Sequence, residues 1–300
     1  MRYFRTTELS DMWSITVTEP AQRIMFKYKI NVILTVLATL FMAGCSSLNT
    51  HEPVCVETDY RKFFHGVNGS VVFYCQESNE YRIFNPALCK MRYSPCSTFK
   101  IFSTLMGLDS GVLQSACTKM GYDGTQYKIN TWNHDVTLEE AFRASCVWYY
   151  EKMIAKLSRN DIQNKLNLLN YGNCDIGAWD DKSSNVFWIE STLQISPVEQ
   201  VNFLHKVFDR KIGFKPEHIA LVKSFMRYDD IGDIAFYGKT GTGRNHRTGH
   251  LEAWFAGFLE TPEQKRCYFA IHIDHPERDV NSPAAREIIR SIIKSGLAPR

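Results

Sequence analysis

Ser97 and Lys100 are the two residues of this chain best suited to covalent chemistry. Residues three apart on a helix lie on the same face, so the Lys100 amine can lie beside the Ser97 hydroxyl. A serine is a weak nucleophile near neutral pH and needs a base within hydrogen-bond reach. A lysine supplies that base only where burial keeps it neutral or where its nitrogen is chemically changed. The apolar residues of segment 99–106 predict such burial, because a charged lysine among them would be expensive to desolvate.

A second chemical motif, Lys239-Thr240-Gly241, directly follows the strand-like segment 234–238. Lys239 supplies a positive charge, Thr240 a hydroxyl donor, and Gly241 the room for a ligand to lie against the strand. Three further motifs stand between Ser97 and Lys239 in the chain. They are Ser145-Cys146-Val147 at the join of two helical segments, Tyr171-Gly172-Asn173 in a loop, and Trp188-Ile189-Glu190 ahead of a capped helix.

The strands that must position these motifs stand at both ends of the chain. Segments 70–75 and 81–84 are rich in strand-forming residues and are separated by a short polar turn, which predicts a hairpin. Three further strand-like runs cover residues 234–237, 253–259 and 267–273. We expect the strands from the two ends to pair with each other.

Helices occupy the middle and the C-terminal end of the sequence. Thr137 and Ser196 each begin a capping box, and Pro197 stands at the first position of the second of these helices. Ser282 begins an amphipathic helix that continues through Ile293. These elements predict an α+β fold: an antiparallel sheet formed by the N- and C-terminal strands, packed against helices, with a mostly helical insertion.

The N-terminal residues carry targeting signals. Lys27 and Lys29 precede an apolar run that is short for a membrane span and typical of a signal peptide. The residues before Cys45 resemble a bacterial lipoprotein signal, in which that cysteine is lipidated, with a plain cleaved signal or an uncleaved anchor as the alternative. We therefore expect an exported protein, in the periplasm or at the cell surface, with a lipid anchor at Cys45. The predicted parts are an upstream extension over 1–24, the signal peptide over 25–44, a tether over 45–62 and a catalytic domain over 63–298.

Charge, cysteines and histidines narrow the choice of partners. The net charge is +3, and residues 1–44 hold five Lys/Arg and three Asp/Glu, which leaves about +1 for the rest and no electrostatic case for nucleic acid. Two histidine pairs have metal-like separations but no convincing third ligand, so we expect no metal site. Export allows disulfides among the cysteines of the body, and their spacing does not choose the pairs. These cysteines are 55, 75, 89, 96, 117, 146, 174 and 267.

Taken together, the motifs resemble those of the class D, or OXA-type, serine β-lactamases of the penicillin-recognising superfamily. The resemblance covers about residues 63–297, and the family's signature blocks occur in order. S-x-x-K and K-T-G are shared with related penicillin-recognising enzymes, and the middle blocks favour class D. The blocks are Pro95-Cys96-Ser97-Thr98-Phe99-Lys100, Ser145-Cys146-Val147-Trp148, Tyr171-Gly172-Asn173, Trp188-Ile189-Glu190 and Lys239-Thr240-Gly241.

The resemblance implies a hydrolase that opens the β-lactam amide through an acyl-enzyme on Ser97. It implies that Lys100 reacts with CO2 or bicarbonate to become N6-carboxylysine, the general base for acylation and deacylation, and that no diffusible cofactor takes part. Trp188 would donate its indole N–H to this carbamate, and apolar Val147 would shield it. Ser145 would relay a proton to the ring nitrogen that leaves.

The resemblance also implies how substrate is held. The backbone N–H groups of Ser97 and Thr242 would form the oxyanion hole. The substrate carboxylate would be bound by residues that include an arginine suited to bidentate contacts. These residues are Lys239, Thr240 and Arg286, while Gly241 lets the substrate lie against the strand. The implied partners are β-lactam antibiotics, and the implied biological effect is resistance to them.

Three alternatives remain open at this point. A β-lactam sensor shares the fold and is acylated without fast turnover; such receptors carry a polar residue at position 147 and a signalling region with a His-Glu-x-x-His motif, and the sequence contains neither. A cell-wall transpeptidase or carboxypeptidase would need Ser97, Lys100 and Lys239, but gives no reason for Trp188. A non-catalytic lipoprotein that binds peptidoglycan or a partner would need none of the catalytic blocks.

Overall fold

A computed structural model describes residues 52–179, 186–245 and 247–298 of the chain. The predicted upstream extension, signal peptide and lipidation site at Cys45 lie outside these residues. Within the described ranges, no helix has the length and apolar character needed to cross a bilayer.

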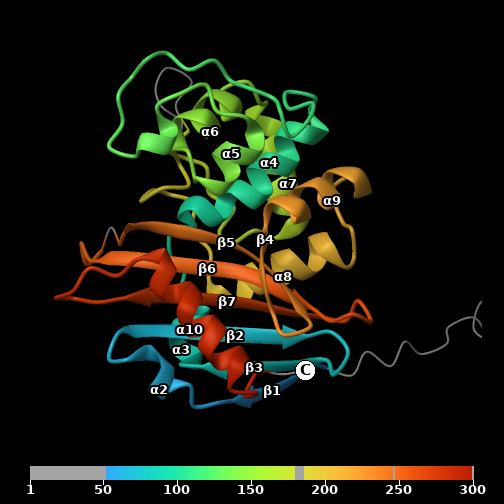
Figure 1. Ribbon diagram of the computed structural model, residues 1–300, viewed down its shortest axis with the longest axis vertical. Coiled ribbons are helices and arrows are strands. Elements are labelled where there is room, and N and C mark those ends of the chain that lie inside the picture. Colours follow the sequence, from blue (N-terminus) through green and yellow to red (C-terminus); the bar gives the residue numbers. More distant parts are fainter. Residues whose placement is uncertain (1–51, 180–185, 246, 299–300) are drawn as a thin grey trace, which may run out of the picture. The chain divides into compact units, whose positions relative to one another are not determined.

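A seven-stranded sheet forms the centre of the fold, with strand order β1-β3-β2-β7-β6-β5-β4 (Figure 1). The N-terminal hairpin of β2 and β3 joins the C-terminal strands because β2 pairs antiparallel with β7, and this confirms the predicted pairing of the two chain ends. Strand β4 is the one strand of the C-terminal group that was not predicted. The bounds are β1 Val54–Glu57, β2 Asn68–Cys75, β3 Glu80–Phe84, β4 Arg227–Ile231, β5 Ile234–Arg244, β6 Leu251–Glu260 and β7 Arg266–Asp274.

The start of the folded domain differs from the prediction of a tether over 45–62. Strand β1 lies within that range and pairs in parallel with β3, so the sheet is not purely antiparallel. Tyr60 is fully buried, and its hydroxyl donates to the carbonyl of Leu297 at 3.0 Å. All four residues of β1 are exposed, so the strand is held by its backbone hydrogen bonds to β3 at the edge of the sheet. Because neither side of β1 is buried, its sequence needs no alternation of apolar and polar residues.

The predicted helix-rich middle is confirmed, and so are both capping boxes, at Thr137 and Ser196. Figure 1 shows α10 crossing one face of the sheet and α4, α5, α6, α7 and α9 gathered beyond its β5–β4 edge. The bounds are α2 Arg61–Phe64, α3 Pro86–Lys90, η1 Cys96–Phe99, α4 Lys100–Asp109, η2 Asn130–Trp132, α5 Leu138–Arg143, α6 Val147–Ile154, α7 Arg159–Leu169, α8 Pro197–Phe208, α9 Pro216–Phe225 and α10 Ser282–Lys294.

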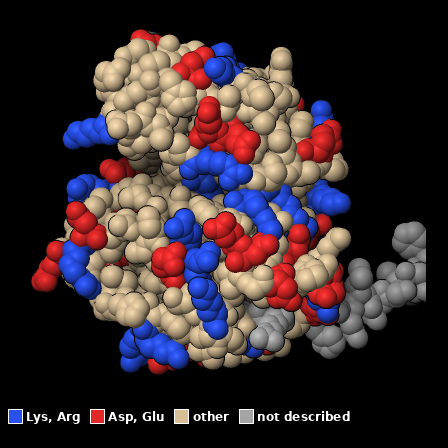
Figure 2. Space-filling model, viewed as in Figure 1, with Lys and Arg blue, Asp and Glu red and all other residues tan. Residues whose placement is uncertain are grey.

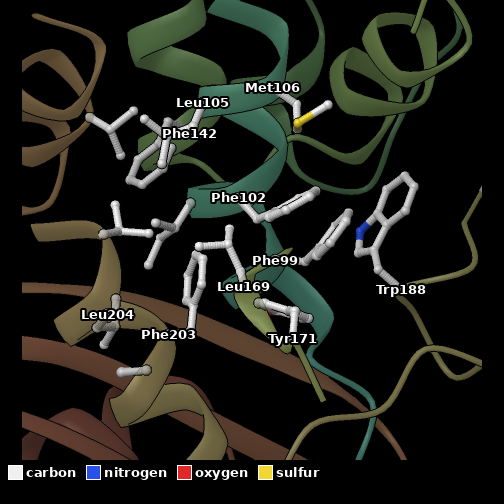
Figure 3. Packing of buried hydrophobic residues seen from close by; sticks show 14 of the residues in the cluster. Phe99, Phe102, Leu105, Met106, Phe142, Leu169, Tyr171, Trp188, Phe203 and Leu204 are labelled. Carbon is white, nitrogen blue, oxygen red and sulfur yellow. The ribbon is translucent and has the colours of Figure 1, made fainter. Parts of the chain in front are cut away.

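Alternate residues of the strands point to opposite faces of the sheet and belong to two separate hydrophobic clusters. Phe255 and Phe269 pack with Ile289 of α10 on one side of the sheet. Phe258 and Tyr268 belong to the larger cluster, which includes the helices on the other side. Figure 3 shows part of this larger cluster, in which rings of α4 and α8 pack beside Tyr171. The helix that carries Lys100 is therefore part of the core.

Strand pairing also decides the disulfide that cysteine spacing left open. Cys75 of β2 lies directly opposite Cys267 of β7, and the two form a disulfide across 192 residues of sequence. Cys96 and Cys146, which flank the predicted catalytic serines, are buried free thiols. Burial raises the pKa of both thiols, so they remain protonated and unreactive.

Candidate active site

Ser97 and Lys100 meet where the short helix η1 runs into α4. The Lys100 Nζ lies 3.0 Å from the Ser97 Oγ, as their spacing predicts. Cys96, with a φ of 49°, turns the chain sharply into η1, a backbone shape that is costly for a residue other than glycine. The Lys100 side chain is 0 % exposed and points into the core. This pair is therefore a serine with a buried amine in hydrogen-bond contact.

Burial changes the chemistry of Lys100. Desolvation lowers the pKa of its amine from 10.5 to about 8. At pH 7 about one amine in ten is then neutral, against about one in three thousand for an exposed lysine. The Tyr150 ring of α6, whose centre lies 5.0 Å from the Nζ, closes one side of the pocket. A neutral amine is able to act as a base or to react with an electrophile, which a protonated one is not.

Strand β5 lies directly against the turn that carries the serine. A Cβ at Gly241 would lie 3.2 Å from the Pro95 carbonyl oxygen and 3.3 Å from the Ser97 nitrogen. Only glycine allows this approach without a shift of the neighbours, which gives the motif's glycine a physical reason. The next residue, Thr242, is exposed. Thr242 follows the residue that makes this close contact with the Ser97 turn, and an oxyanion hole formed by the Ser97 and Thr242 N–H groups stays a prediction.

Lys239 and Ser145 form a second hydrogen-bonded pair. The Lys239 Nζ donates to the Ser145 Oγ at 2.5 Å and to the Thr240 Oγ1 at 3.3 Å. Ser145 has a φ of 54° in the link between α5 and α6, an uncommon backbone shape that turns its hydroxyl toward β5. Burial and the nearby charge of Lys100 hold the pKa of Lys239 well below its usual range. Ser145 therefore has a donor that can exchange protons with it.

Trp188 is buried in the aromatic cluster beside α4. Its ring stacks on Phe99 with centroids 5.7 Å apart, and Figure 3 shows the two side by side. The indole Nε1 is buried and has no hydrogen-bond partner among the described residues. A buried donor without a partner carries a desolvation penalty of about 1–3 kcal/mol, so this N–H is suited to an acceptor that is not part of the chain. Val147, partly buried, begins α6 as an apolar residue.

The hydrogen bonds of the Tyr171-Gly172-Asn173 motif shape the loop. The Asn173 side chain donates to the Thr192 carbonyl at 2.8 Å and accepts from the Gln194 N–H at 2.9 Å. Tyr171 is fully buried. The loop that carries Trp188 is thereby tied to the end of α7.

Arg286 contacts Tyr228 and Glu287. Its guanidinium carbon is 5.2 Å from the centre of the Tyr228 ring, and its Nε is 3.5 Å from the Glu287 carboxylate. Tyr228 and Lys239 both line a cavity of about 570 Å³ between α5, α9, β4 and β5. Figure 2 shows Lys and Arg side chains gathered across the middle of this face of the molecule. Contact of Arg286 with a substrate carboxylate stays a prediction.

Two contacts of the site were not predicted from the sequence. Tyr150 packs on Lys100, and the Glu190 Oε1 accepts the backbone N–H of Arg244 at 2.7 Å, which ties the Trp188 loop to β5. Tyr150 follows Val147 by three residues on α6, so helical spacing could have placed it on the same face. No local pattern pairs Glu190 with a strand 54 residues later.

Comparison with known protein families shows which family contains this site. The penicillin binding protein transpeptidase domain matches residues 68–294. The chain belongs to this penicillin-binding family. The resemblance predicted from the motifs is confirmed, because class D β-lactamases are among its relatives.

Members of the family with two different functions are similar to this chain. Beta-lactamase OXA-20 of Pseudomonas aeruginosa is 31% identical over 274 residues, which are 88% of this chain and 97% of OXA-20. Regulatory protein BlaR1 of Bacillus licheniformis is 34% identical over 244 residues, which are 80% of this chain. The chain spans only 39% of the length of BlaR1.

A solved structure of a class D β-lactamase confirms the α+β fold. The class D β-lactamase YbXI from Nostoc superposes with a TM-score of 0.73 at 29% identity, covering 79% of this chain and 98% of YbXI. The shared fold extends over the domain that contains both hydrogen-bonded pairs.

Proposed function

We propose that this protein hydrolyses the amide bond of β-lactam antibiotics through an acyl-enzyme on Ser97, and so confers resistance to them. The observation that carries the proposal is the Lys100 amine, which is fully buried, has a pKa lowered to about 8 and lies 3.0 Å from the Ser97 hydroxyl. A serine next to such a base is able to form and release an acyl ester.

The residues around Lys100 fit an N-carbamate formed with CO2 or bicarbonate. A carbamate supplies a carboxylate-like base, which is stronger as a hydrogen-bond acceptor than the amine. The unpartnered Trp188 Nε1 is the donor that would hold it, and Val147 keeps polar groups away. Lys100 must be neutral to react with CO2, and its lowered pKa supports this.

The remaining groups support the two halves of the reaction. The Ser97 Oγ attacks the lactam carbonyl carbon, its proton passes to the base at residue 100, and the C–N bond breaks as Ser145 gives a proton to the ring nitrogen. Lys239, 2.5 Å from Ser145, restores that proton. The Ser97 and Thr242 N–H groups bind the developing oxyanion. The proton that residue 100 took from Ser97 returns to Lys239 through solvent, so both groups are restored. A water molecule then gives a proton to residue 100 as its oxygen attacks the ester carbonyl carbon, and that proton passes to the Ser97 Oγ as the ester C–O bond breaks.

A β-lactam sensor is the second candidate, and its support is the similarity to BlaR1. A sensor would use the same acylation by Ser97 and would retain the ester. Apolar Val147 supports hydrolysis, since the sensors are expected to carry a polar residue there. We also propose export through the signal peptide at 25–44, with Cys45 as the lipid attachment site; the supporting observation is the residue pattern alone.

Penicillin hydrolysis by the full chain, with and without added bicarbonate, tests the proposal. We expect turnover that bicarbonate increases, and loss of turnover in Ser97→Ala and Lys100→Ala. A stable acyl-enzyme without turnover at any bicarbonate concentration would favour the sensor. Absence of any acylation would overturn both.

A further inference from the structure

We propose that Ser94 is a positioning residue that fixes the Trp188 indole for the carbamate on Lys100. This inference rests on the proposed function. Ser94 lies three residues before the nucleophile and is 2 % exposed, and its hydroxyl donates to the Trp188 carbonyl. Its effect would therefore be transmitted through Trp188.

Two donors from the segment before Ser97 hold the Trp188 carbonyl. The Ser94 Oγ donates to it at 3.0 Å, and the Cys96 backbone N–H donates to it at 2.9 Å. A carbonyl oxygen has two lone pairs, so both are used. The backbone of Trp188 is thus fixed to the turn that begins the nucleophile's helix.

Ser94 is itself fixed to the sheet. The Trp254 Nε1 of β6 donates to the Ser94 carbonyl at 3.0 Å. The neighbouring Tyr93 stacks on His272 of β7 with ring centroids 3.7 Å apart. Tyr93 also exchanges two backbone hydrogen bonds with Ile195, at 2.8 and 3.0 Å, at the far end of the Trp188 loop. The segment 93–96 therefore joins two strands of the sheet to the loop.

These hydrogen bonds explain how the indole N–H of Trp188 can keep a fixed direction although Trp188 lies in a loop. The Trp188 ring is confined by Phe99 and Phe187, whose centroids lie 5.7 and 5.3 Å away. The Phe99 ring stacks on the indole and the Phe187 ring meets it edge-on, so packing limits rotation of the indole, and a shift of the Trp188 backbone therefore shifts its N–H as well. Ser94 fixes the position of the Trp188 backbone relative to the Ser97 backbone. The indole N–H therefore keeps a constant position relative to the base at residue 100.

The test compares Ser94→Ala with Ser103→Ala in the full chain. Ser103 is a matched control, since its hydroxyl is also buried and also donates to a backbone carbonyl, that of Phe99 at 3.2 Å. Penicillin hydrolysis is measured against bicarbonate concentration, and the carbamate is followed by ¹³C NMR with labelled bicarbonate. Melting temperature reports general destabilisation.

We expect Ser94→Ala to raise the bicarbonate concentration for half-maximal rate about threefold, less than the loss of a hydrogen bond to the carbamate itself, because the Cys96 N–H still holds the Trp188 carbonyl. The carbamate signal should show the same shift, and the rate at saturating bicarbonate should stay within about twofold of the wild type. Ser94→Thr, which keeps the hydroxyl, should restore the wild-type requirement, and Ser103→Ala should leave it unchanged. Should Ser94→Ala not fold, Trp254→Phe, which removes the donor to Ser94, should shift the requirement about threefold in the same direction.

A lower melting temperature in Ser94→Ala with an unchanged bicarbonate requirement would overturn this inference and leave the proposed function standing. A wild-type chain whose rate does not respond to bicarbonate, and which gives no carbamate signal, would instead overturn the proposed function itself.

Discussion

Replacing Lys100 with methionine should make this protein more stable while abolishing its activity. Burial lowers the pKa of Lys100 from 10.5 to about 8, which means that the folded state disfavours the charged amine. Below pH 8 the lysine is protonated in both states, and folding carries the full penalty, about 3 kcal/mol. Methionine has a similar length and no charge, so Lys100→Met should gain about that amount at pH 7.

The pH dependence separates this cause from ordinary repacking. Between pH 8 and 10.5 Lys100 is protonated in the unfolded chain and neutral in the folded chain. The free energy of unfolding of the wild type therefore increases with pH over this range. The advantage of Lys100→Met should therefore be complete below pH 8 and disappear toward pH 10.5.

Urea unfolding at pH 6, 7, 9 and 10 in bicarbonate-free buffer measures this difference. Lys128→Met, at an exposed position, serves as the control and should change stability by less than about 0.5 kcal/mol at each pH. A Lys100→Met chain that is less stable than the wild type at pH 7, or an advantage that does not change with pH, would refute the reasoning.

Three other changes test separate parts of the site and fold. Trp188→Phe keeps a buried ring and removes the N–H, so the bicarbonate concentration for half-maximal rate should rise at least about tenfold; an unchanged requirement would exclude the indole as the carbamate donor. Gly241→Ala places a Cβ 3.2 Å from the Pro95 carbonyl, so kcat/KM for penicillin should fall about 10- to 100-fold, and an unaltered value would contradict the close contact. Replacing Cys75 and Cys267 with alanine should lower the free energy of unfolding by about 2–4 kcal/mol in urea, whereas Cys117→Ala, at a free exposed thiol, should not.

Local patterns predicted most of the groups that the fold brings together. The three-residue spacing of Ser97 and Lys100, and the apolar residues around them, were enough to predict a buried pair, because helix geometry acts over a single turn. Strong strand signals predicted five of the seven strands, and a capping signal predicted the helix before Ser145.

Contacts made over long distances in sequence could not be predicted in the same way. The pairing of Cys75 with Cys267 depends on the register of two strands from opposite ends of the chain. Strand β1 is held by backbone hydrogen bonds alone, which any residue can make. Ser94 looks like an ordinary loop serine, since only the folded chain brings the Trp188 carbonyl to it.

The central claim, that Ser97 forms an ester with a β-lactam and then releases it, is tested most directly by intact mass during turnover. The full chain is mixed with penicillin in bicarbonate buffer and its mass is followed over time, beside Ser97→Ala. We predict a transient increase equal to the mass of the antibiotic, its disappearance as free penicilloate accumulates, and no increase in Ser97→Ala. An adduct that persists while no penicilloate appears would contradict hydrolysis, and an adduct in Ser97→Ala would contradict the nucleophile.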